Sequence, residues 1–135
     1  MLKKKLDDGT IVELSVESVQ GGVLITLGNI DASPDIPKYE LSFMLNPVEA
    51  SELISRLRSY GSRCRITSAH GRTLIFNAPA EYEAVPPKIE IVHGDENIIF
   101  PLREHEVLLI RKALESMAAS LLFVGTWSGE AEALS

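Results

Sequence analysis

Residues 39–57 read YELSFMLNPVEASELISRL, and two different periodicities meet inside this stretch. Leu41, Phe43 and Leu45 stand at every second position, which is typical of a strand with one buried face. An Asn-Pro pair follows, with a Glu three residues after the Asn, and this pattern predicts a capped helix start. Apolar residues then recur at helical spacing as far as Leu57, and Gly61 is the expected C-cap. The stretch therefore predicts a strand that leads directly into an amphipathic helix.

The segments on either side extend this pattern into two successive units. Before it, we expect strands at Leu2–Leu6, Thr10–Ser18 and Val23–Leu27. After it, we expect strands at Arg63–Ala69, Arg72–Ala78, Lys88–His93 and Ile98–Leu102, and a helix from Arg103 to about Phe123. The sequence predicts an α+β fold of two tandem units, each of about four antiparallel strands plus one helix (β4-α-β4-α), sharing one core. The expected single domain covers residues 1–124, with units at 1–61 and 62–124, and a C-terminal tail at 125–135.

The two units align at a fixed offset of 57 residues across the last strand and the helix. The matched positions are Leu41, Phe43 and Leu45 with Ile98, Phe100 and Leu102, and Glu49, Leu53 and Leu57 with Glu106, Ile110 and Leu114. The cap is not repeated, because Arg103 stands where Asn46 does. We interpret the match as an internal duplication, with chance similarity as the alternative.

The composition limits the classes of partner. The formal net charge is −6, and this acidic balance argues against coating nucleic acid through bulk electrostatics, so a local basic surface would be needed. The single cysteine, Cys64, excludes an internal disulfide and favours a reducing compartment, so we expect a cytoplasmic protein. The longest apolar region, Val107–Val124, is interrupted by charged residues, and it predicts a core helix rather than a membrane span.

Residue patterns for catalysis are absent from the sequence. His70, His93 and His105 do not share metal-ligand spacing with one another, and turn or surface positions explain them better. The sequence has no phosphate-binding glycine loop and no nucleophile elbow. We therefore expect no catalytic residue, no metal and no cofactor, and we predict that the protein is not an enzyme.

One predicted strand face has a chemistry suited to nucleic acid. If His70-Gly71 closes a two-residue hairpin, Arg65 pairs with Phe76, and both share the solvent face with Arg63 near Arg72. Guanidinium groups follow phosphates while bases stack on a ring, so this face predicts a single-stranded nucleic-acid surface. Two further candidates, Lys3 and Lys5, lie off the core face of the first strand and would extend it. The alternative is an ordinary solvated face, with Glu13 neutralising Lys3 and Phe76 lying under a loop.

The second helix carries more apolar residues than one buried stripe needs. Leu108, Leu109 and Leu122 lie off the main stripe, which predicts a homo-oligomer that buries them. The same residues favour an alternative function, a protein-interaction module such as an assembly adaptor or chaperone.

The region Gly71–Met117 resembles the Whirly-type and related transcriptional-coactivator-type single-stranded DNA-binding proteins. The string at Ile98–Leu102, IIFPL, followed by Glu106 and Ile110, carries most of this likeness, and Tyr39–Leu57 repeats it more faintly. The resemblance implies non-enzymatic binding of single-stranded DNA or RNA along sheet surfaces, usually as dimers or tetramers, and a role in transcription or DNA maintenance. The lysine-rich strand sequence typical of plant Whirly proteins is not found here.

Overall fold

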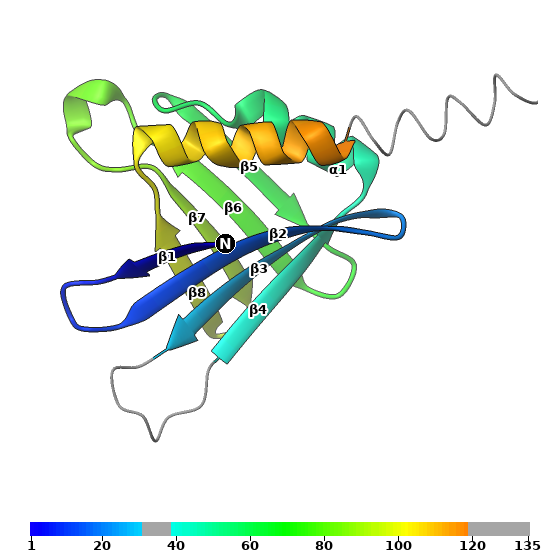
Figure 1. The fold of residues 1–135 in the computed structure, drawn as a ribbon, viewed down its shortest axis with the longest axis horizontal. Coiled ribbons are helices and arrows are strands. Elements are labelled where there is room, and N and C mark those ends of the chain that lie inside the picture. Colours follow the sequence, from blue (N-terminus) through cyan, green and yellow to red (C-terminus); the bar gives the residue numbers. More distant parts are fainter. Residues whose placement is uncertain (31–38, 119–135) are drawn as a thin grey trace, which may run out of the picture.

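Two antiparallel four-stranded sheets, each followed by a helix, make up the described part of the chain, which is residues 1–30 and 39–118 of a computed structural model (Figure 1). Sheet A has the order β1 (Leu2–Lys5), β2 (Ile11–Val19), β3 (Gly22–Ile30) and β4 (Tyr39–Leu45), and α1 (Pro47–Arg56) follows it. Sheet B has the order β5 (Ser62–Thr67), β6 (Arg72–Ala78), β7 (Lys88–His93) and β8 (Glu96–Pro101). A short 3-10 helix, η1 (Glu81–Glu83), precedes β7, and a final helix begins at residue 104 and reaches the last described residue, 118. The predicted α+β class and β4-α-β4-α order are confirmed.

The start of α1 agrees with the sequence prediction, and its end does not. The Asn46 side chain accepts a hydrogen bond from the Glu49 amide at 2.8 Å, and the Glu49 carboxylate accepts one from the Asn46 amide at 3.0 Å. These two bonds form a complete capping box with Pro47 at the first turn. The prediction of Gly61 as C-cap is wrong, because α1 ends at Arg56 and Leu57 is its C-cap. Gly61 instead turns the chain into β5 at a φ of 64°.

The final helix repeats half of this cap. The Arg103 amide donates to the Glu106 carboxylate at 2.8 Å, as the Asn46 amide does to Glu49. Glu106 and Glu49 are 57 residues apart, so the sequence offset extends to the hydrogen bond that begins each helix. Arg103 has no side-chain oxygen to complete the box, as the sequence predicted.

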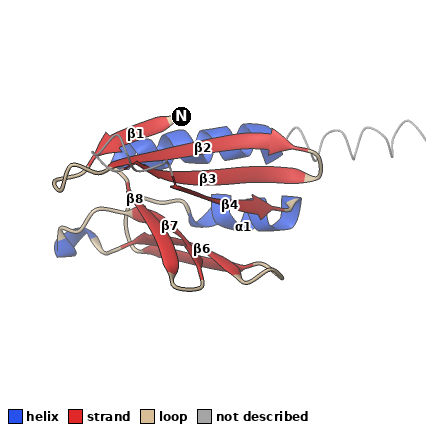
Figure 2. Ribbon diagram, turned by 90° about the horizontal axis from the view of Figure 1, so that it is seen from below, coloured by secondary structure: helices blue, strands red, loops and turns tan. Residues whose placement is uncertain are grey.

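The two sheets stack face to face as separate layers (Figure 2). Their facing sides are filled by large apolar side chains, among which Phe43, Phe76 and Phe100 are fully buried. The helices add apolar faces to the same core: Leu53 of α1 and Ile110 and Leu114 of the final helix are buried with the sheet residues. In the described residues, no helix has the length and apolar character needed to cross a membrane.

An ion pair joins β1 to the final helix. The Lys4 ammonium contacts the carboxylate of Glu106, and both side chains are largely buried. The Lys4 nitrogen also lies 5.4 Å from the centre of the Phe100 ring, within the range of a cation–π contact. Burial raises the pKa of Glu106, but hydrogen bonds from Lys4 and from the Arg103 amide outweigh it, so the pKa lies below its usual value. The carboxylate is thus held charged inside the fold.

The predicted register of the β5–β6 hairpin is wrong by one residue. The loop has three residues, not two: the Gly71 amide donates to the Ser68 carbonyl at 3.2 Å, and the Ser68 amide donates to the Arg72 carbonyl at 2.8 Å. Gly71 takes a φ of 80°, as expected for a type I turn followed by a left-handed residue. The Ser68 hydroxyl accepts from the Arg72 amide at 3.2 Å and closes the loop further.

This shift moves Phe76 from the solvent face to the core. Cys64, not Arg65, pairs with Phe76, and Arg65 pairs with Ile75. Because side chains alternate along a strand, a slip of one residue exchanges the two faces. Phe76 is fully buried, so the prediction that it provides an exposed stacking ring is wrong.

Some predictions lie outside the described residues. They are the last part of the helix up to about Phe123, the apolar residue Leu122, and the tail at 125–135. The structure describes all the remaining candidate residues, which are Lys3, Lys5, Arg63, Arg65, Arg72, Leu108 and Leu109.

Candidate nucleic-acid interface

The outer face of sheet B carries Arg63 and Arg65 side by side on its edge strand. They are two positions apart on β5, so they project from the same face with about 6.8 Å between their Cα atoms. Both side chains are exposed. Neither forms an ion pair with another residue in the described part of the chain. The sequence prediction that these two arginines share a solvent face is confirmed.

The strand register extends this basic edge across the sheet. Arg63 pairs with Asn77, and Asn77 pairs with Lys88, so one row of the face carries two cations with an amide between them. In the next row Arg65 pairs with Ile75, and Ile75 pairs with Glu90. We call the outer face of sheet B that holds these residues the basic face.

The strands of the basic face carry one carboxylate, which is engaged away from the arginines, and a second acid, Glu83 of η1, lines a hollow of about 260 Å³ with Arg63 and Asn77. Glu90 lies on β7, two strands from β5, and accepts a hydrogen bond from the Asn97 side chain at 2.8 Å. Two strand spacings amount to about 9.6 Å, so the charge of Glu90 weakens the potential at β5 only partly. Ile75, which is half-buried, lies between Arg65 and Glu90, and Ile99, which is 38% exposed, lies beyond Glu90 on β8. The face therefore offers cations along one edge and apolar side chains beside them.

Lys3 and Lys5 do not extend the basic face. They lie on the outer face of sheet A, and the two sheets pack through their inner faces, so these outer faces point in opposite directions (Figure 2). Lys3 forms an ion pair with Glu13 at 3.2 Å, as the sequence predicted. The outer face of sheet A also carries Glu17 and Glu40, which makes it the more acidic of the two. The predicted continuity between the lysines and the arginines is wrong.

Arg72 also belongs to a different surface. It follows the hairpin loop and lies on the inner side of sheet B, where its Nη1 atom donates to the Ser42 carbonyl of β4 at 2.7 Å. The guanidinium therefore connects the two sheets instead of joining Arg63 and Arg65. The prediction that it stands with them is wrong, because the three-residue loop places it in phase with the core residues Leu74 and Phe76.

Sequence reasoning missed Lys88, which the structure adds to the basic face. Its strand was predicted, but its neighbours depend on which residues pair across β6, and the hairpin was assigned the wrong register. With the observed loop, the pairing of Arg63 with Asn77 and of Asn77 with Lys88 follows directly. The only signal in the sequence was the Ser-Ala-His-Gly loop, which fits a three-residue turn with Gly at the left-handed position.

The described residues offer neither a reactive thiol nor a metal-binding cluster. Cys64 is buried, and burial, with a smaller contribution from Glu52, raises the pKa of its thiol, which disfavours the thiolate. In the described part of the chain, no group of three or more His, Cys, Asp or Glu side chains is arranged to hold a metal ion.

The arrangement defines a class: an α+β protein of two stacked antiparallel four-stranded sheets, each followed by a helix. Among solved structures this arrangement is found in WHY3 from Arabidopsis thaliana. The TM-score is 0.54 with 12% sequence identity, over 100% of this chain and 98% of that chain. The resemblance to Whirly-type proteins is thus supported at the level of topology. No family model and no curated protein matches the sequence.

Proposed function

We propose that this protein binds single-stranded nucleic acid on the basic face of sheet B, without enzymatic activity. The observation that carries the proposal is the pair of exposed arginines, Arg63 and Arg65, on the outer face of an edge strand. An extended chain that lies across the outer face of sheet B can contact both side chains. The Whirly-like topology supports the same function, since the resemblance drawn from the sequence implies strand binding along sheet surfaces.

The mechanism follows from the side chains on the face. Arg63, Arg65 and Lys88 neutralise successive phosphates, and the bases lie against the aliphatic surface of Ile75 and Ile99. Because Phe76 is in the core, no aromatic ring of the basic face stacks on a base. Phosphate contacts then supply most of the affinity, so we expect little sequence preference and a strong dependence on salt.

Charge reversal at the two arginines tests the proposal. We expect Arg63→Glu/Arg65→Glu to weaken the binding of labelled oligothymidine by roughly 100-fold at low salt, because two attractive contacts become repulsive. The slope of log affinity against log salt should fall by about 1.4, which is about 0.7 for each of two phosphates on a single strand. Fluorescence anisotropy at several salt concentrations measures both quantities.

The matched control is Lys5→Glu/Lys112→Glu. It makes the same change in net charge, from −6 to −10, at exposed positions that are not part of sheet B. Near-normal binding by this control, with loss in the arginine variant, locates the contact on the basic face. Equal losses in both variants would show a general effect of net charge and would remove the basic face as the binding site.

A second candidate function is association between protein chains through the final helix. Leu108 and Leu109 are 50% and 52% exposed, although Val107 and Ile110 beside them are buried. Leu109 also lines an apolar hollow of about 190 Å³ with Leu2 and Val16. Two consecutive exposed leucines on a surface helix favour a contact with another protein chain.

This candidate has its own test. We expect wild type to form a dimer or larger homo-oligomer at high concentration, and Leu108→Ser/Leu109→Ser to shift it to monomer, because the apolar contact area is lost. Light scattering during gel filtration reports the mass, and circular dichroism confirms that the variant is folded. A wild type that stays monomeric at millimolar concentration contradicts self-association through this helix.

A further inference from the structure

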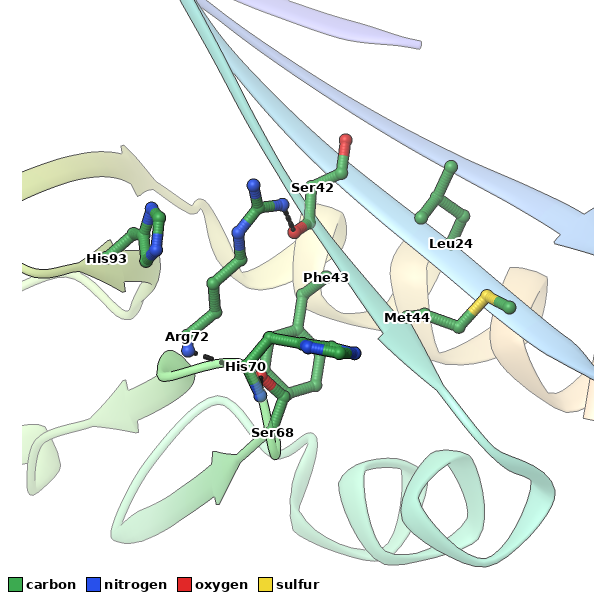
Figure 3. A pocket seen from close by; sticks show the side chains of 8 residues that line it. All are labelled: Leu24, Ser42, Phe43, Met44, Ser68, His70, Arg72 and His93. Atoms are coloured by element: carbon green, nitrogen blue, oxygen red, sulfur yellow. Dashed lines mark hydrogen bonds between the residues drawn. The ribbon is translucent and has the colours of Figure 1, made fainter.

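A hollow of about 480 Å³ lies at the edge strand β4, where the outer face of sheet A meets the β5–β6 loop of sheet B (Figure 3). Sheet A supplies Leu24 on β3 and edge strand β4. Sheet B supplies the loop between β5 and β6, together with the residues that begin β6 and end β7. The lining residues are Leu24, Ser42, Phe43, Met44, Ser68, His70, Arg72 and His93. This volume is in the range of pockets that hold small ligands.

Arg72 is held in the wall of this hollow. Its hydrogen bond to the Ser42 carbonyl fixes the guanidinium against β4, as Figure 3 shows. A guanidinium has five N–H donors, and this bond uses one of them. Arg72 pairs with His93 across β6 and β7, so these two side chains leave the same face of the sheet next to each other. His70 extends from the neighbouring loop.

The lining has two chemically different sides. One side carries the cation and hydrogen-bond donors of Arg72, His70 and His93, while Leu24 and Met44 form an apolar side. None of the lining residues is a carboxylate. The nearby acid Glu96 accepts a hydrogen bond from the Tyr39 hydroxyl, and neither residue lines the hollow. An anion beside a flat apolar group matches this pattern, and arginine is well suited to hold the oxygens of a phosphate.

We propose that this hollow binds a nucleotide, with the phosphate at Arg72, His70 and His93 and the base against Leu24 and Met44. The bound nucleotide has two possible sources. One is a free nucleoside monophosphate. The other is the phosphorylated end of a strand on the basic face, because β5, which carries Arg65, runs directly into the loop that lines the hollow. The second source rests on the proposed function, and the first does not.

The test uses free nucleotides and two kinds of oligonucleotide. Titration calorimetry with AMP and with dTMP measures the free source. Anisotropy with oligothymidine carrying either a 5′-phosphate or a 5′-hydroxyl measures the strand-end source. Binding of either nucleotide at one site per chain supports the free source, and preference for the 5′-phosphate supports the strand end. We expect His70→Ala/His93→Ala to weaken the observed binding, of the free nucleotide or of the 5′-phosphorylated oligonucleotide, by about tenfold or more, since two donors to an anion are lost.

Control variants separate nucleotide binding in the hollow from strand binding on the basic face. Arg63→Glu/Arg65→Glu should leave nucleotide binding unchanged, because neither arginine lines the hollow. Met44→Ala, at an exposed position that supplies part of the apolar side, should weaken nucleotide binding while the protein stays folded. The proposal is overturned if neither nucleotide binds and the two oligonucleotides bind equally, or if the double histidine variant binds as wild type does.

Discussion

Phe76→Ala is expected to lower the free energy of unfolding by about 4 kcal/mol. Phe76 is fully buried on β6, between the two layers of the fold. Removal of the ring loses its transfer free energy and leaves a cavity that its cross-strand neighbours Cys64 and Ile89 fill only in part. Urea denaturation followed by circular dichroism measures the loss.

Ile75→Ala is the matched control, at the neighbouring position on the opposite face. Ile75 is half-buried on the basic face, so its truncation should cost about 1 kcal/mol or less. The two losses together report the register of the hairpin. If Ile75→Ala were the more destabilising change, the register with Phe76 on the solvent face would be correct, and the description of the basic face would fail.

Lys4→Met is expected to lower the free energy of unfolding by about 3 kcal/mol at neutral pH, the second largest decrease. The substitution retains an apolar side chain of similar length against Phe100 but leaves the Glu106 carboxylate buried without its cation. Lys3→Met is the control, because Lys3 is 61% exposed in its pair with Glu13, and its removal should cost below about 1 kcal/mol. Urea denaturation of both variants gives the comparison.

The pH dependence identifies the ion pair as the cause. The pKa of Glu106 is lowered in the folded protein, so its contribution to stability is present above the unfolded value of 4.5 and is lost as the pH falls through the lower, folded value. The deficit of Lys4→Met should therefore shrink as the pH falls below about 4.5, because a protonated Glu106 no longer needs a cation. Lys4→Met/Glu106→Gln should recover much of the lost stability at neutral pH. A deficit that is the same at pH 7 and pH 3 would show that packing, not charge, explains the loss.

The order of elements was predictable from the sequence because strong local signals mark it. Alternation at Leu41, Phe43 and Leu45 and the Asn46-Pro47 start placed β4 and the start of α1 within a residue or two, as the complete capping box confirms. The apolar string Ile98–Leu102 and the helical spacing after Arg103 placed the last strand and the start of the final helix in the same way. These signals are local, so they do not depend on how the strands pair.

The basic face was harder to predict from the sequence, because its residues are brought together by the register in which the strands pair. Arg63 and Arg65 share a face whatever the loop length, so that prediction is confirmed. The neighbours of the two arginines depend on one residue in the hairpin loop, and the wrong loop length placed Phe76 and Arg72 on the wrong side. Lys3 and Lys5 were assigned to the same surface only because nothing in the sequence shows how the two sheets stack.

The most direct test of the central claim is the site at which a single strand contacts the protein. Backbone amide chemical shifts, recorded by NMR during titration with oligothymidine, map that contact residue by residue. We expect the largest changes on β5 and at the outward positions beside it, Arg63, Arg65, Ile75 and Lys88, with little change on sheet A. Changes concentrated on the outer face of sheet A or around Leu108 and Leu109 would contradict binding through the basic face.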